Sequence, residues 1–437
     1  MHKYINIFGL IILMFTNHNI TAADLYDIYK RALIHNNEFA IVKNDYKVSE
    51  EKYNQTFSSI FPDINLTATS NKTEIHRYEG VGSTNDFSSE TYAINIKQPI
   101  FRLAFFDERK KSMDNVKKSN ININEKLDTI IIDSVRLYFN VINASNLIEE
   151  AELKRELASK IYQSSLKLFE RGMITDKILR ENKNNLDLNN LDYEITLNNL
   201  ETTKHEILIF AGRELYEIHD LNPNAEIELE MYDLNNILKI AVSESNAIKS
   251  AEFDVSMNKN DLKSKKSQHY PTIDLVASYD YNDTSSGTRF GANKRESSTI
   301  GLSLNFPIYQ GGFQTSKVRE SRINLSSAKL TLDHLKRQIK RDVNDIFNQH
   351  STMRKKMSIL KDNYNSSYAN LQSAKKGYAN GIYTDVALLR SEIEYTESKN
   401  NYTRSVFDYL LADLQLKKYS STLSEQDLLK VNSMLVW

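Results

Sequence analysis

The chain has 437 residues and a formal net charge of −1, from 56 Lys and Arg against 57 Asp and Glu. This balance argues against a strongly basic nucleic-acid-binding protein, and the absence of cysteine excludes disulfide scaffolds, thiolate metal sites and a lipid-modified N-terminal cysteine. A composition of 26% charged and 40% hydrophobic residues excludes a multi-span helical membrane protein, and with 12 Gly and 5 Pro the chain has few positions that end a helix.

Residues 1–22 have the pattern of a secretory signal peptide. Lys3 precedes an apolar run over residues 4–15, and small residues follow at 21–23. The apolar run is too short to cross a bilayer as a helix, but it suits the hydrophobic part of a signal peptide. We therefore expect the protein to be exported and the mature chain to begin near Ala23.

The mature chain contains two copies of one repeated unit. Four landmarks recur at a nearly constant offset of 208 or 209 residues: Asp24-Leu25 as Asp233-Leu234, Phe61-Pro62 as Tyr270-Pro271, Pro99-Ile100 as Pro307-Ile308, and Gly172 as Gly381. A constant offset predicts a tandem duplication. We expect a first structural repeat over 23–222 and a second over 223–437, each in the order helix, strand, strand, long helix, helix.

Two long segments predict uninterrupted helices, because residues 107–171 and 313–376 contain neither Gly nor Pro. At 1.5 Å per residue each helix would be roughly 90–100 Å long, about three times the thickness of a bilayer core. Apolar residues form a narrow stripe in the second segment, at Leu325, Ala328, Leu332, Leu335, Ile339, Val343 and Ile346. Such stripes with charged flanks predict coiled-coil-like packing.

Four shorter segments alternate between apolar and polar residues. The apolar members are Ile64, Leu66 and Ala68; Tyr92, Ile94 and Ile96; Ile273, Leu275 and Ala277; and Ile300, Leu302 and Leu304. This alternation predicts β-strands, joined in pairs by polar loops near 70–89 and 282–298. Each strand is expected to have about ten residues, which is enough to cross a bilayer at a tilt.

Four strands are too few to close a barrel within one chain. Strands in lipid must close, because unpaired backbone groups find no water there, and known bacterial barrels have at least about eight strands. The sequence therefore predicts that several chains share one barrel. The alternative is a soluble four-stranded sheet packed on helices, which would leave the long helices with nothing to span.

The sequence resembles the TolC family of outer-membrane efflux proteins over essentially the whole mature chain. The resemblance rests on the duplication, on the strand starts FPDINL and YPTIDL, and on IKQPIF, LNFPIYQGGFQTSKVRES and YANGIYTDVALLRSEIEYTESKNNY. It implies an α+β membrane protein, a homotrimer in which four β-strands per protomer complete a twelve-stranded β-barrel. Long coiled-coil-like helices would form an α-barrel tunnel, so that the two repeats make one channel domain.

The resemblance also implies a location and a function. The barrel would lie in the lipid of the cell outer membrane and the helices in the periplasm. The protein would be the channel of a tripartite efflux or type I secretion system, passively conducting substrates from a periplasmic adaptor (membrane fusion protein) and an inner-membrane ABC or proton-driven transporter. The choice between these pathways stays open. The alternative is an exported coiled-coil structural or adhesion protein of the envelope without a pore.

No enzyme, metal, cofactor or nucleic-acid partner is expected. The sequence contains no His-Glu-x-x-His, Gly-x-Ser-x-Gly or Gly-x-x-x-x-Gly-Lys-Ser/Thr motif. In the resembling family, the periplasmic gate and the adaptor-docking surface lie at the turns between the helices. The corresponding residues here are Gly172, Thr175, Asp176, Gly381, Thr384, Asp385 and Arg390.

These turn residues have a second interpretation, in which they only end one helix and begin the next. Each glycine can end a helix in the left-handed conformation. Each threonine can cap the next helix, with the aspartate near its positive end. The best-known family members carry two aspartates where this chain has Ala387 and Arg390. We therefore expect a neutral or cationic constriction, in which Arg390 pairs with Asp385 or Glu392.

Overall fold

The computed structural model describes most of the mature chain. The described residues are 24–76, 86–213, 219–222, 225, 227–285 and 292–435. The predicted signal peptide, residues 1–22, lies outside them, as do Pro223 and Asn224 near the expected boundary between the repeats.

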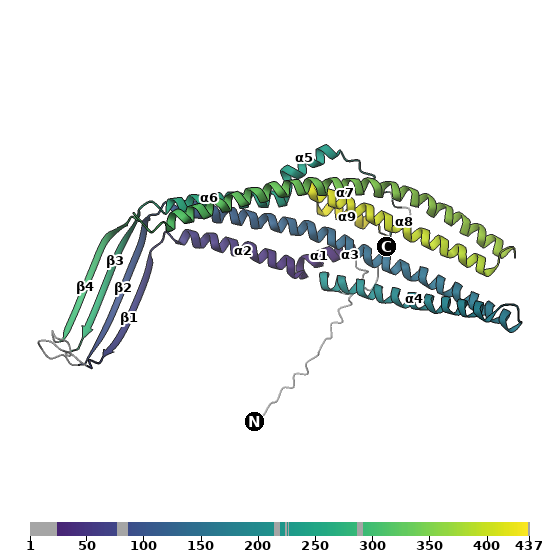
Figure 1. Ribbon diagram of the computed structural model, residues 1–437, viewed down its shortest axis with the longest axis horizontal. Coiled ribbons are helices and arrows are strands. Elements are labelled where there is room, and N and C mark those ends of the chain that lie inside the picture. The colour runs from purple at the N-terminus through teal and green to yellow at the C-terminus, as the bar shows by residue number, and fades with distance from the viewer. Residues whose placement is uncertain are drawn as a thin grey trace, which may run out of the picture.

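The molecule is elongated, with a four-stranded sheet at one end and long helices running away from it (Figure 1). The elements in chain order are α1 (Leu25–His35), α2 (Asn37–Ser58), β1 (Asp63–Thr73), β2 (Phe87–Phe101), α3 (Ala104–Glu170), α4 (Asp176–Ala211), α5 (Leu234–Glu244), α6 (Asn246–Ser267), β3 (Thr272–Thr284), β4 (Asn293–Asn305), α7 (Phe313–Ala379), α8 (Asp385–Tyr419) and α9 (Glu425–Ser433). The predicted combination of long helices and four strands is confirmed.

The two long helices are α3 and α7, and each has 67 residues. Near the sheet they pack on α2 and α6, and in the half away from the sheet they pack on α4 and α8 (Figure 1). Each long helix therefore changes partners near its middle. Within the described residues, no helix is both long and apolar enough to cross a membrane.

The first helix of each half is divided in two, which the sequence analysis did not anticipate. Asn36 leaves the helical conformation at ψ 112°, and its side-chain oxygen accepts a hydrogen bond of 2.9 Å from the backbone N–H of Phe39. Asn36 therefore caps α2. Ser245 stands at the corresponding break between α5 and α6, with ψ 130°. Neither break carries a Gly or Pro, so the composition gave no sign of it.

The strands form one antiparallel sheet in the order β1-β2-β3-β4. The register places Leu66 opposite Ile94, Ile94 opposite Tyr279, and Ala277 opposite Ile300. The expected alternation thus gives one apolar face. The strands are longer than expected, between 11 and 15 residues, because their ladders continue into the polar segments that were predicted as loops.

The largest hydrophobic core lies near the middle of α3, where the packing of this helix changes from α2 and α6 to α4 and α8. It joins residues of α1, α3, α4, α8 and α9. At its centre the rings of Phe139 and Phe407 stack, with 3.8 Å between centroids and an interplanar angle of 10°. The neighbouring Tyr138 is fully buried, and its hydroxyl accepts a hydrogen bond of 3.0 Å from the backbone N–H of His219. This core fixes the middle of the molecule, between the sheet and the far helical ends.

Candidate functional site

The seven predicted site residues lie at the helical ends opposite the sheet. Here α3 turns into α4 and α7 turns into α8 (Figure 1). The structure places all seven in or just after these two turns. We call this end of the molecule the helical tip.

Both predicted glycines adopt the left-handed conformation. The φ angle is +72° at Gly172 and +71° at Gly381, a region that residues with a Cβ rarely occupy. The residue after each glycine donates its backbone N–H to a carbonyl five positions earlier, Met173 to Leu168 and Ile382 to Gly377. These bonds satisfy carbonyl groups that the helix end leaves open.

The two threonines differ in how they begin the following helix. The side chain of Thr384 accepts a hydrogen bond of 3.2 Å from the backbone N–H of Ala387, as a cap should. Thr175 has the extended N-cap conformation but makes no side-chain capping bond. The capping prediction is therefore confirmed for Thr384 and wrong for the side chain of Thr175.

The two aspartates also differ, although they occupy corresponding positions. Asp176 pairs with Arg180 in its own helix, at 2.5 Å. Asp385 of α8 instead pairs with Lys160 of α3, at 2.8 Å. Lys160 also contacts Glu156 at 2.7 Å, and its hydrogen bonds to Asp385 and Glu156 raise its pKa. Asp385 thus links the two helical pairs, whereas Asp176 stabilises only α4.

A second lysine of α3 forms a similar link nearer the middle of the molecule. The Nζ atom of Lys154 lies 2.7 Å from Glu150 and 2.7 Å from Glu397 of α8. Asn400 of α8 donates a hydrogen bond of 2.9 Å to the same Glu150. Sequence reasoning missed both lysine links because the partners lie more than 200 residues apart.

The expected pairing of Arg390 is wrong for this protomer. Asp385 is taken by Lys160, and Glu392 lies 4.0 Å from the Nζ atom of Lys375. Arg390 is exposed and makes no ion pair with any residue that the structure describes. Its charge therefore faces solution at the tip.

The aromatic ring of Tyr383 packs directly on the backbone of α7 at Gly377. A Cβ atom at Gly377 would lie 2.3 Å from Cδ2 of Tyr383, so only glycine leaves room for the ring in this position. The sequence signal was a glycine inside an otherwise glycine-free helix, which marks a close approach.

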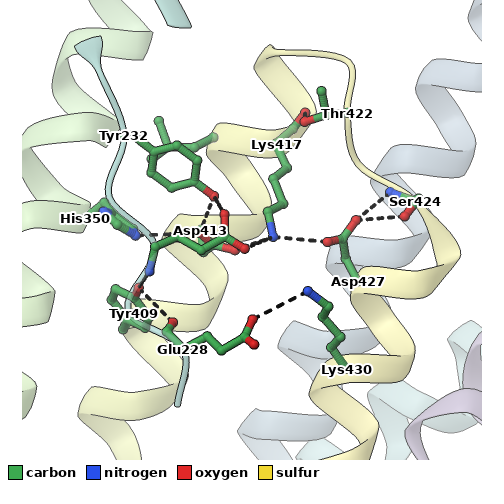
Figure 2. A network of polar contacts seen from close by, with 12 residues as sticks. Glu228, Tyr232, His350, Tyr409, Asp413, Lys417, Thr422, Ser424, Asp427 and Lys430 are labelled. Carbon is green, nitrogen blue, oxygen red and sulfur yellow. Dashed lines mark hydrogen bonds and ion pairs between the residues drawn. The ribbon is translucent and has the colours of Figure 1, made fainter.

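A second polar site, which the sequence did not reveal, lies near the middle of the molecule (Figure 2). The ammonium group of Lys417 on α8 lies 3.0 Å from each of three carboxylates, those of Glu230, Asp413 and Asp427. They belong to the segment before α5, to α8 and to α9. Asp427 also accepts a hydrogen bond of 2.9 Å from the backbone N–H of Ser424, the N-cap of α9, and so forms part of a capping box. We call these four charged side chains the Lys417 cluster.

Burial strengthens the Lys417 cluster. The side chains of Lys417, Asp413 and Asp427 are only 13%, 12% and 13% exposed. Burial alone would lower the pKa of Lys417, but the three carboxylates outweigh it and raise the pKa. The lysine is therefore held in its charged form, and it ties three segments of the chain together.

Comparisons with known proteins all find similarity to outer-membrane efflux proteins, secretion proteins or channels. The family described as "Outer membrane efflux protein" matches residues 237–420. The chain is 23% identical to outer membrane protein TolC of Escherichia coli over 423 residues, covering 95% of this chain and 85% of that protein. It is 22% identical to the alkaline protease secretion protein AprF of Pseudomonas aeruginosa, covering 78% of this chain and 72% of that protein. The solved CmeC outer membrane channel of Campylobacter jejuni matches with a TM-score of 0.72 at 16% identity, covering 94% of this chain and 89% of that one.

Proposed function

Because the chain belongs to the outer membrane efflux protein family, we propose that it is the channel of a tripartite efflux or type I secretion system. The protein is located in the cell outer membrane, with its long helices in the periplasm. The main support for the proposal is the exposed apolar face of the sheet. Its apolar face is exposed, with Leu66 at 72%, Ile300 at 76% and Leu302 at 70%. Such a face requires lipid or a partner to cover it.

We propose a homotrimer, because the open sheet edges require several copies and the resemblance to the TolC family implies three. Among the described strands, β1 and β4 each pair on one side only, and open edges cannot stay unpaired in lipid. Pairing β1 of one copy with β4 of the next satisfies both edges. Three copies give twelve strands, above the minimum of about eight for a bacterial barrel. The two repeats, 23–222 and 223–437, would then alternate around the ring as parts of one channel domain.

The opposite face of the sheet would line the bore. Its side chains are polar and small, and they include Asn65, Thr67, Asn95, Ser278, Thr299 and Ser303. Such a lining lets solutes pass in water, so conduction is passive and the energy comes from a partner transporter. The helical tip would hold the gate and dock a periplasmic adaptor, with the seven predicted residues at its turns.

Two pathways remain to be separated by experiment. One relative is a protease secretion protein, which supports type I secretion with an ABC transporter. Another match is CmeC, described as an outer membrane channel, a description compatible with efflux by a proton-driven transporter. Co-purification from the native membrane with one transporter class or the other distinguishes them.

We expect the purified protein to give single-channel conductance steps in planar bilayers, and Leu302→Arg to abolish them. An Arg on the lipid-facing side of a barrel costs about 2–4 kcal/mol per copy at mid-membrane. Ser303→Arg, one residue away on the polar face, is the matched control and should still insert. A monomeric protein that gives no steps would contradict the channel and favour the envelope coiled-coil alternative.

We expect Asp385→Asn to increase the open probability of the channel about tenfold. The change weakens the link between α8 and Lys160 of α3. An exposed link contributes about 0.5 kcal/mol, and three copies together approach the 1.4 kcal/mol that corresponds to a factor of ten.

Single-channel recording measures this effect, and the internal repeat supplies its control. Asp176→Asn removes a pair within one helix and should leave the open probability unchanged. If both variants open equally, the link to Lys160 does not restrain the tip.

A further inference from the structure

The internal repeat extends to the boundaries of the long helices. α2 and α6 each have 22 residues, α3 and α7 each have 67, and each boundary in the second half lies 209 residues after its counterpart in the first. Near the sheet the four helices form a row in which α2 contacts α3, α3 contacts α6 and α6 contacts α7. The contact of α3 with α6 joins the two halves, and among the described helices it has no counterpart on α7 within one protomer.

The contact of α3 with α6 is made by polar side chains that pair across the two helices. The pairs are Lys111 with Asp261 at 2.7 Å, Asp114 with Ser256 at 2.6 Å, Lys118 with Asp254 at 2.7 Å and Asn122 with Ser250 at 3.3 Å. All four α3 residues are buried or half-buried. The pairs run in opposite directions along the two chains and fix the register of an antiparallel helix pair.

The corresponding face of α7 is exposed. A shift of 209 residues takes the four α3 residues to Glu320, Ile323, Ser327 and Thr331, all of which are exposed. The side chains of Ile323 and the neighbouring Leu330 are 65% and 66% exposed. A face that is covered on α3 and carries exposed apolar side chains on α7 lacks its cover within the protomer.

The corresponding face of α2 is exposed as well. The α6 residues Ser250 and Asp261 have Ile41 and Lys52 of α2 as their counterparts, and Val48 lies between these two. Ile41 is 57% and Val48 is 49% exposed, and Lys52 is also exposed. The molecule therefore has two open faces that are equivalent to the two sides of the contact between α3 and α6.

One ion pair changes sign between the two contacts. Where α3 carries Lys111 and α6 carries Asp261, α7 carries Glu320 and α2 carries Lys52. Within the protomer Glu320 pairs with Lys317 of its own helix. If α3 met α2 of another copy in this register, Lys111 would face Lys52. If α7 met α6 of another copy, Glu320 would face Asp261. Like charges across a contact are unfavourable, so the reversal rejects both wrong combinations.

We propose that α7 of one protomer packs on α2 of the next in the register of α3 on α6, and that the ion pair of Glu320 with Lys52 selects this partner. α2 and α7 are the outer helices of the row, so one copy offers its α7 face and the next offers its α2 face. The register places Ile323 against the turn of α2 that carries Val48, and it covers exposed apolar side chains on both helices. The inference rests on the proposed homotrimer and adds the residues by which one copy recognises the next.

Charge reversal tests the selection. Glu320→Lys and Lys52→Glu should each lower the association constant of the trimer at least tenfold, because each variant places like charges at three contacts. The variant that combines both changes regains opposite charges and should regain the trimer. Asp333→Lys is the matched control, because its counterpart Asn124 is exposed on α3 and Asp333 therefore lies outside the proposed contact. Sedimentation equilibrium of the full protein in mild detergent measures the association.

Disulfide formation tests the register without reversing a charge. The chain has no cysteine, so only introduced residues can link the copies. Thr331 and Ile41 are the counterparts of Asn122 and Ser250, whose side chains lie 3.3 Å apart. Thr331→Cys combined with Ile41→Cys should therefore give covalent dimers and trimers on oxidation. Thr331→Cys combined with Val48→Cys is the matched control, because Val48 lies two helical turns, about 10 Å, from Ile41 and beyond the reach of a disulfide.

The outcomes separate this proposal from the proposed function. A trimer that conducts ions but links equally through both cysteine pairs overturns the register and leaves the channel standing. The selection by charge is overturned if neither single reversal weakens the trimer, if Asp333→Lys weakens it as much, or if the combined variant associates no better than the single ones. A protein that stays monomeric and gives no conductance overturns both the contact and the channel.

Discussion

Replacing Lys417 by Met is expected to lower the free energy of unfolding by about 3 kcal/mol, as for other buried ion pairs that lose one partner. The methionine fills nearly the same volume, but Asp413, Asp427 and Glu230 then face one another with no cation between them. Two of these carboxylates are nearly buried, so water cannot replace the ammonium group. Urea unfolding of the detergent-solubilised protein measures the loss.

The pH dependence of the Lys417→Met variant provides an internal check. Without the ammonium group, the mutual repulsion of the carboxylates raises their pKa in the folded state. The folded state then binds more protons than the unfolded chain, so stability recovers as the pH falls. We expect a smaller loss at pH 5.5 than at pH 8.

Lys430→Met is the control for the Lys417→Met variant. Lys430 pairs with Glu228 at 3.6 Å, but both side chains are exposed, at 59% and 76%. Exposed pairs contribute about 0–1 kcal/mol, so this variant should unfold almost as the unaltered protein does. Equal losses for the two lysines would mean that burial plays no part in the Lys417 cluster.

The long helices and the strands could be predicted because each depends on a local pattern. The absence of Gly and Pro over 107–171 anticipated α3 within three residues at either end, since helix propensity adds up along the chain. The alternation at Ile64 and Leu66 anticipated the apolar face of β1, because side chains of a strand point alternately to its two faces. The left-handed conformation of Gly381 was predictable for the same reason, because it is a property of one residue in one turn.

The polar contacts that the sequence did not reveal depend on packing between segments that lie far apart in the chain. The partners of Lys417 include Glu230, 187 residues away, and Asp385 reaches Lys160 only because α3 and α8 pack side by side. Charged residues at these positions look like ordinary solvated helix faces until the packing is known. The prediction for Arg390 was wrong for the same reason, since the nearest carboxylates in the sequence were already engaged by other helices.

The Phe407→Ala variant is expected to lose about 4 kcal/mol of stability, within the range for large aromatic residues in a core. Phe407 and Phe139 are each 1% exposed and stack face to face. Truncating one ring leaves a cavity beside the other, between α8 and α3. Because this pair lies where α3 changes partners, the loss should affect the middle of the molecule more than the sheet. Urea unfolding measures the loss, and hydrogen exchange shows where it falls.

Phe169→Ala is the matched control, because Phe169 lies near the tip of α3 and is 38% exposed. Its removal should cost less than about 1 kcal/mol, as surface changes usually do. A double variant of Phe139 and Phe407 should lose less than the two single variants combined, since both remove the same contact. If the stability losses are additive, the contact between the two rings does not contribute to stability. The stability of the core between α3 and α8 would then have to depend on its other residues.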